Sequence, residues 1–145
     1  MKKIVLGVIA TLFIMCSPIK TEVRDDFRSS SKQETKNFLK EVNGTSDSKS
    51  VLILTKGYKG EKIIATQEGK TVYSKHPISN LKTHLADYFS FENNKILIIT
   101  DNFSKQEVRI EPKKAAKYKF IYLRKDYDKD VATYKITFSN TLRAM

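Results

Sequence analysis

The sequence has few of the residues that mark several special classes of protein. Its 145 residues include one cysteine, two histidines, three prolines, five glycines and no tryptophan. So little glycine and proline excludes collagen-like and mucin-like chains, and a 40% hydrophobic fraction is enough to build a packed core. The one cysteine is Cys16, near the N-terminus. Disulfides, thiolate metal sites and cysteine nucleophiles are therefore excluded from the rest of the chain.

Motifs of common catalytic and nucleotide-binding sites are also missing. The chain contains no G-x-S-x-G, no phosphate-binding G-x-x-x-x-G-K, no G-x-G-x-x-G and no H-E-x-x-H. We therefore expect a protein that is not an enzyme and that uses no cofactor. Paired carboxylates carry no motif, because folding brings them together. A small carboxylate-dependent hydrolase using Glu61, Glu92 or Glu107 is thus an alternative.

Alternating acidic residues give one weak indication of a metal site. Asp126, Asp128 and Asp130 form the D-x-D-x-D start of a calcium loop. The pattern then departs from an EF-hand, because Val131 and Thr137 stand where that loop needs glycine and glutamate. We therefore expect no metal site.

The first segment is typical of a bacterial export signal. Lys2 and Lys3 precede an uncharged, mostly apolar run over residues 4–15. At about 1.5 Å per residue, a helix of that length is too short for a bilayer core of about 30 Å. We therefore interpret residues 1–17 as a signal peptide and expect export to the periplasm or the cell exterior. Cys16 follows the apolar run where a lipoprotein signal places its acylated cysteine, which makes it a candidate lipidation site.

The charge balance is strongly basic and favours an acidic partner. The chain has 27 Lys and Arg against 16 Asp and Glu, and loss of Lys2 and Lys3 lowers the net charge from +11 to +9. Such a charge attracts acidic polysaccharide or an acidic protein of the cell envelope. Export argues against nucleic acid as a partner. We expect contact with a membrane only through a lipid on Cys16.

Residues 18–49 are polar and contain few aromatic residues, which predicts a tether. Within it, Ser31 and Glu34 have the spacing of a capping box, in which each side chain accepts the backbone N–H of the other residue. Phe38, Leu39 and Val42 then share one face, and residues 43–44 (Asn-Gly) favour a stop. A short helix over residues 32–42 is predicted.

From residue 50 onward the sequence predicts an all-β domain over residues 50–145. Short runs rich in Ile, Val, Thr, Tyr and Phe alternate with turn residues. The predicted strands are 51–56, 61–66, 70–74, 95–100, 106–111, 118–125 and 131–138. We expect a seven-stranded two-sheet sandwich, immunoglobulin-like or transthyretin-like, with a short helical crossover over residues 78–91. An OB-like barrel with appended strands is the alternative.

Basic and aromatic residues are interleaved between residues 113 and 125, which makes this stretch the candidate binding site. Basic residues that flank the rings of Tyr118, Phe120 and Tyr122 can attract anionic polymers. The candidates for contact with a polyanion are Lys117, Lys119, Arg124 and Lys125. The alternative is that the rings belong to the core and the lysines protect a sheet edge.

Taken together, these features predict an exported, non-enzymatic β-sandwich that serves as a binding or interaction module of the bacterial cell envelope. A periplasmic inhibitor or accessory subunit of a partner protein is the main alternative. The sequence does not identify the ligand.

Overall fold

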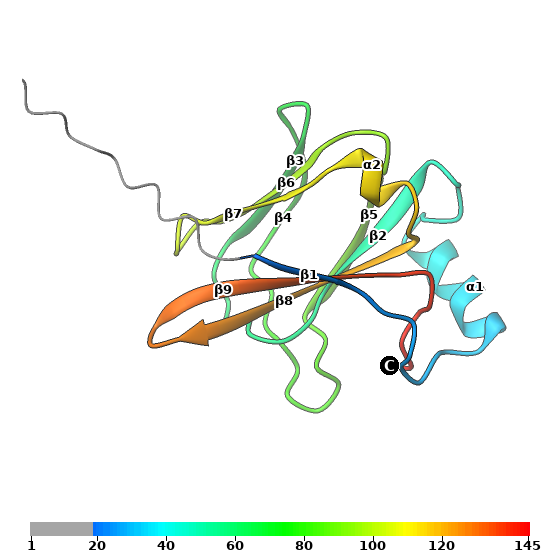
Figure 1. Ribbon diagram of the computed structural model, residues 1–145, viewed down its shortest axis with the longest axis horizontal. Helices are drawn as coiled ribbons and strands as arrows, with labels where there is room; N and C mark the ends of the chain where they lie inside the picture. The colour runs from blue at the N-terminus through cyan, green and yellow to red at the C-terminus, as the bar shows by residue number, and fades with distance from the viewer. Residues whose placement is uncertain (1–18) are drawn as a thin grey trace, which may run out of the picture.

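The computed structural model describes residues 19–145, and two stacked β-sheets dominate them (Figure 1). The expected signal peptide at 1–17 and Cys16 lie outside the described residues. One sheet has five strands and the other has four. The elements in chain order are β1 (Lys20–Val23), α1 (Lys32–Glu41), β2 (Lys49–Leu54), β3 (Ile63–Gln67), β4 (Lys70–Lys75), β5 (Asp87–Glu92), β6 (Leu97–Asp101), β7 (Glu107–Ile110), α2 (Pro112–Ala115), β8 (Phe120–Asp128) and β9 (Val131–Ser139).

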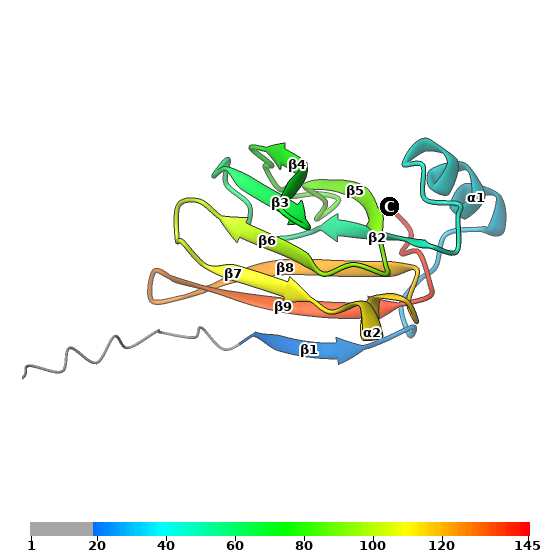
Figure 2. The same cartoon turned by 90° about the horizontal axis from the view of Figure 1, so that it is seen from above.

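The five-stranded sheet has the order β1-β9-β8-β2-β5, and the four-stranded sheet has the order β4-β3-β6-β7. Figure 2 shows β1, β9, β8 and β2 following one another in one layer, with β7, β6 and β3 in the other. Two neighbouring pairs, β1 with β9 and β2 with β8, run parallel, and the other pairs are antiparallel. The all-β sandwich is therefore confirmed, and the chain forms two separate sheets where the alternative required a closed barrel.

Strand β8 is covered on both faces, because it contributes to two hydrophobic cores. Ile121 and Leu123 belong to the core between the two sheets. Phe120 and Tyr122 point to the other face, where they pack with Phe38 of α1 and other apolar side chains. Phe120 and Tyr122 therefore do belong to a core, but it is the core under the helix. The outer face of the five-stranded sheet is closed at one end by α1 (Figure 1).

Helix α1 begins at a capping box and ends at a left-handed residue. The Glu34 N–H donates to Ser31 Oγ at 3.2 Å, and the Ser31 N–H donates to Glu34 Oε2 at 2.7 Å. Asn43 has φ 53°, a conformation that terminates helices, and the Gly44 N–H donates to the Leu39 carbonyl. The observed bounds lie within one residue of the predicted helix.

The predicted helical crossover over residues 78–91 is wrong. Residues 79–86 form an irregular loop, and residues 87–92 are strand β5. The Asn80 side chain accepts the N–H groups of Lys82 and Thr83, and His84 has φ 57°, which breaks a helix. Leu81, an apolar residue inside the predicted crossover, is 90% exposed.

Within residues 19–145, strand β5 and strand β1 raise the number of strands from the predicted seven to nine. Residues 18–49 were predicted to be a tether, but the described part belongs to the sandwich. Strand β1 pairs with β9, and the Asp25 carboxylate accepts hydrogen bonds from Ser139 Oγ at 2.6 Å and the Asn140 N–H at 3.0 Å. The polar composition of residues 18–49 did not indicate this strand, because β1 joins the sheet through backbone pairing with β9 at a sheet edge.

The hairpin between β8 and β9 is the longest pairing of the fold, as the alternating sequence indicated. Its turn contains only Lys129 and Asp130, both with positive φ (48° and 68°), as a two-residue type I′ turn requires. Across residues 19–145, no helix has the length and apolar character needed to span a membrane.

Candidate functional site

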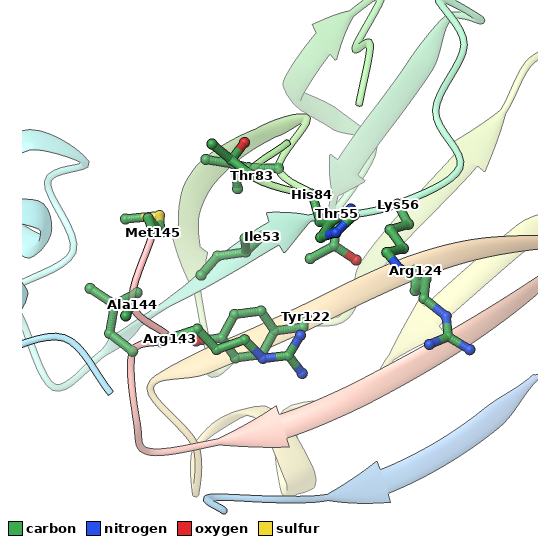
Figure 3. A pocket seen from close by; sticks show the side chains of 12 residues that line it. Ile53, Thr55, Lys56, Thr83, His84, Tyr122, Arg124, Arg143, Ala144 and Met145 are labelled. Carbon is green, nitrogen blue, oxygen red and sulfur yellow. Dashed lines mark hydrogen bonds between the residues drawn. The ribbon is translucent and has the colours of Figure 1, made fainter. Parts of the chain in front are cut away.

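A cavity of about 370 Å³ opens on the outer face of the five-stranded sheet, beside the C-terminal segment. Its walls come from β2, the 80–85 loop, β8 and residues 142–145, as Figure 3 shows. Segments that lie far apart in the sequence therefore have to meet before the cavity exists. The lining residues are Ile53, Thr55, Lys56, Thr83, His84, Leu85, Tyr122, Arg124, Leu142, Arg143, Ala144 and Met145.

Arg143 is the most unusual side chain of this cavity. Its guanidinium carbon lies 4.2 Å from the centre of the Tyr122 ring and 4.5 Å from that of Phe27. These two rings meet edge to face, so the guanidinium sits in the corner between them. Nε of Arg143 is buried without a hydrogen-bond partner, and no carboxylate within residues 19–145 forms an ion pair with this side chain.

Burial lowers the pKa of the Arg143 guanidinium from its ordinary value, and the positive charges of Arg24 and Arg124 act in the same direction. An arginine nevertheless stays protonated in proteins. The cavity therefore holds a fixed positive charge with at least one unused donor.

The backbone around Arg143 is fixed by hydrogen bonds. The Arg143 N–H donates to the Tyr122 hydroxyl at 2.9 Å, and that hydroxyl donates to the Thr141 carbonyl at 2.9 Å. Ser30 Oγ donates to the Arg143 carbonyl at 3.0 Å, and the Ala144 N–H donates to the Arg28 carbonyl at 2.8 Å. The C-terminal segment is thus held between β8 and residues 28–30, which fixes the backbone that carries the Arg143 side chain.

The other charged side chains lining the cavity are basic. Lys56 and Arg124 share it with Arg143, and no Asp or Glu among residues 19–145 lines it. Arg124 is paired with Asp126, with Nη2 2.9 Å from Oδ2. A smaller cavity of about 230 Å³ lies next to it and shares Thr55, Tyr122, Arg124 and Arg143. Its one carboxylate, Glu22, is already held by Lys135 and Thr137.

The four predicted contact residues do not form one surface. Lys117 is exposed and lies near Lys119, in a pocket at one end of the sheet. Nζ of Lys119 donates to the carbonyls of Gly44, Ser46 and Lys49 at 2.8–2.9 Å, and burial lowers its pKa. Arg124 lines the cavity of Arg143. Lys125 is 2% exposed and cannot contact a polyanion, which corrects that part of the prediction.

Lys125 instead forms a buried charged cluster with Asp101 and Glu61, which we call the Lys125 triad. Nζ of Lys125 lies 2.5 Å from Asp101 Oδ2 and 2.6 Å from Glu61 Oε1. The exposed fractions of the Lys125, Asp101 and Glu61 side chains are 1%, 1% and 7%.

Burial lowers the pKa of Lys125, but its hydrogen bonds to Asp101 and Glu61 outweigh this and raise the pKa overall. For Asp101, burial raises the pKa and the hydrogen bonds from Lys125 and Tyr134 lower it overall. Lys125 and Asp101 therefore form an ion pair in the folded protein.

The acidic candidates among residues 19–145 do not gather at a metal site. Within residues 19–145, no group of three or more His, Cys, Asp or Glu side chains is placed to hold a metal ion. Among the hydrolase candidates, Glu61 lies in the Lys125 triad, Glu92 pairs with Lys95 and Glu107 is exposed on β7. None of these three lines the cavity of Arg143.

No protein-family model matches the chain, and no curated protein matches it in sequence. The geometry of the cavity is therefore the basis for proposing a function.

Sequence reasoning missed Arg143, because residues 140–145 carry no motif and no periodic pattern. The nearest indication was Tyr122, which the sequence placed among the aromatic residues of the candidate site.

Proposed function

We propose that this protein is an exported, non-enzymatic β-sandwich of the bacterial cell envelope that binds an acidic polysaccharide. The acidic group of the ligand would enter the cavity beside Arg143. Export rests on the apolar N-terminal run, and the choice of an acidic ligand rests on the cavity. We also propose an immunoglobulin-like or transthyretin-like type of sandwich, although β1–β9 and β2–β8 pair in parallel where an immunoglobulin domain is antiparallel.

The unpaired guanidinium of Arg143 carries this proposal. Buried polar groups almost always have hydrogen-bond partners, and a buried donor without one costs about 1–3 kcal/mol. Nε of Arg143 has none, and no carboxylate within residues 19–145 forms an ion pair with this side chain. A carboxylate or other oxyanion matches the planar fork of a guanidinium, and it would supply both the hydrogen-bond acceptor and the opposite charge.

The surroundings of Arg143 favour an anion that enters from solvent. Lys56 and Arg124 add positive charge around the same space, which raises the local concentration of anions. The volume of about 370 Å³ lies at the lower end of the range for small-molecule sites. It suits one acidic sugar unit of a polymer better than a long segment of chain.

Calorimetric titration with an oligogalacturonate tests the proposal, with an uncharged oligosaccharide of equal length as the comparison. We expect the acidic oligomer to bind and the uncharged one not to bind. Replacing Arg143 with glutamine should weaken binding at least tenfold, which is about 1.4 kcal/mol. Added salt should weaken binding in the unmodified protein, because the attraction is between charges.

Arg109→Gln is the matched control. Arg109 is exposed on the four-stranded sheet and pairs with Glu111 at 2.8 Å, so its loss removes the same charge far from the cavity. This variant should bind like the unmodified protein. Equal losses in both variants would show that only net charge matters, and unchanged binding in Arg143→Gln would overturn the proposed site.

A further inference from the structure

The Lys125 triad places an amine against a carboxyl group in the interior, and the two come from different sheets. Lys125 is on β8 and Asp101 is the last residue of β6. We propose that Lys125 and Asp101 join in an intramolecular amide bond between Nζ and Cγ, with Glu61 carrying the proton. This bond is independent of the anion-binding function proposed above.

Burial supplies the driving force for this reaction. Ionised groups in the interior have lost the solvation that stabilises them in water, and the side chains of Lys125 and Asp101 are each 1% exposed. Condensation to an amide removes the charges of both Lys125 and Asp101. It leaves Glu61 as the only ionisable group of the three.

The fold also holds the two groups in place. Nζ and Oδ2 are in hydrogen-bond contact, so the reaction is intramolecular between groups that are already positioned. Lys125 N–H donates to the Lys56 carbonyl, and Gly57 packs so closely that a Cβ there would lie 1.8 Å from the Lys125 carbonyl oxygen. The backbone of Lys125 is thus fixed against the loop that leads to Glu61.

Asp101 has donors suited to stabilising a tetrahedral intermediate. The N–H groups of Phe103 and Ser104 donate to Oδ1 at 2.9 and 3.2 Å, and the Tyr134 hydroxyl donates to Oδ2 at 2.8 Å. Negative charge that develops on these oxygens during attack at Cγ would meet donors already in position.

The reaction balances without any other reagent. Glu61 takes one proton from the Lys125 ammonium and passes it to Oδ2 of Asp101, and the neutral Nζ then attacks Cγ of the resulting carboxylic acid. The Nζ–Cγ bond forms and the Cγ–Oδ2 bond breaks. Oδ2 leaves as water with two of the three ammonium protons, one of them carried by Glu61. The third proton stays on the amide nitrogen, so nothing is oxidised or reduced.

The chain contains a solvent-exposed pair at the same distance, which serves as an internal control. Nζ of Lys95 lies 2.5 Å from Glu92 Oε2, but these side chains are 34% and 49% exposed. Water solvates both charges there, so an amide at that position gains nothing from removing them. We expect a bond between Asp101 and Lys125 and none between Glu92 and Lys95.

Peptide mapping by mass spectrometry tests the proposal on the full chain. The folded protein is incubated, denatured and digested. We expect the peptide containing Asp101 to be joined to the peptide containing Lys125, with a mass one water below their sum. If both peptides of the unmodified protein are found free, the proposal is overturned. A joined Glu92–Lys95 product would overturn the argument from burial.

Two variants separate the roles in the triad. Lys125→Arg keeps the positive charge but removes the attacking amine, so the joined peptide should be lost. Glu61→Gln keeps the shape but takes up no proton at neutral pH, so joining after refolding should slow about 10²-fold. If joining in Glu61→Gln is as fast as in the unmodified protein, Glu61 is not the proton carrier. The map of the unmodified protein decides the bond itself even if a variant fails to fold.

Discussion

The Tyr122 hydroxyl connects β8 to the C-terminal segment through two hydrogen bonds, with Arg143 as donor and Thr141 as acceptor. Burial raises the pKa of Tyr122 to about 12, so the hydroxyl stays protonated near neutral pH. Tyr122→Phe keeps the ring under Arg143 but leaves both backbone groups unpaired. We expect a loss of about 1–3 kcal/mol in the free energy of unfolding, measured by urea titration.

Tyr88→Phe is the control for this prediction. Its hydroxyl donates to the Glu41 carboxylate on the surface, where water replaces the lost bond. Its effect should stay within about 0.5 kcal/mol. Equal destabilisation by both variants would contradict the role assigned to Tyr122.

Alanine substitutions at two glycines distinguish the cost of backbone strain from the cost of a steric clash. Gly57 and Gly69 both have positive φ (94° and 75°), but only Gly57 packs against another strand. Gly69→Ala should cost about 1–2 kcal/mol, the ordinary penalty for a side chain in the left-handed region. Gly57→Ala adds a collision with the Lys125 carbonyl and should cost more than about 4 kcal/mol. Thermal and urea unfolding measure both, and similar losses would contradict the close approach of Gly57 to β8.

The burial of Lys125 could have been predicted from alternation alone. The sequence placed Ile121 and Leu123 on one face of the strand, and Lys125 continues that series. Its position in the two-sheet core follows from period-two geometry. The identity of its partners did not follow, because Asp101 and Glu61 reach Lys125 only through the stacking of the two sheets.

Strand β1 is attached to the fold partly through the carboxylate of Asp25. The Ser139 hydroxyl and the Asn140 N–H donate to it and lower its pKa below 3.8. A carboxyl with a lowered folded-state pKa stabilises above its unfolded value and loses this contribution as the pH falls through the folded value. Below about pH 3.8, the amides of β1 should therefore exchange hydrogen faster, after correction for the intrinsic pH dependence.

The contribution of Asp25 should be at most about fivefold, because one exposed charged contact contributes under about 1 kcal/mol. Glu22 on the same strand adds to it. Burial raises the Glu22 pKa, but hydrogen bonds with Lys135 and Thr137 lower it overall. In Asp25→Asn, the pH dependence should shrink to the part from Glu22. An unchanged profile in that variant would show that Asp25 does not hold the strand.

Elements with strong local signals could be predicted, and those that depend on distant partners could not. The capping box gave α1, and alternating residues gave the β8–β9 hairpin. Strand β5 was mistaken for a helix, because Tyr88 and Phe89 fit both periods and both are partly buried, on opposite sides of the sheet. Only the two-sided environment of β5 distinguishes the strand from a helix face.

At the scale of the whole molecule, the candidate cavity lay beyond sequence reasoning. The net charge of +11 directed attention to basic residues, but it did not say which of them lack acidic partners. Arg124 was chosen because it stands beside aromatic residues, and it does line the cavity. Arg143 reaches the same space because the final residues fold back beside residues 28–30, a contact between the two ends of the described chain.

The double-sided burial of β8 makes its alignment ambiguous for hydrophobic forces alone. Residues 120–123 are apolar on both faces of the strand. A slip of one position along β2 would therefore still bury apolar side chains on each face of the sheet. Such a slip would, however, place Arg124 in the interior between the sheets and leave Asp101 without its cation, Lys125. The Lys125 triad thus selects the correct register of β8, because it destabilises misaligned sandwiches that apolar packing alone would tolerate.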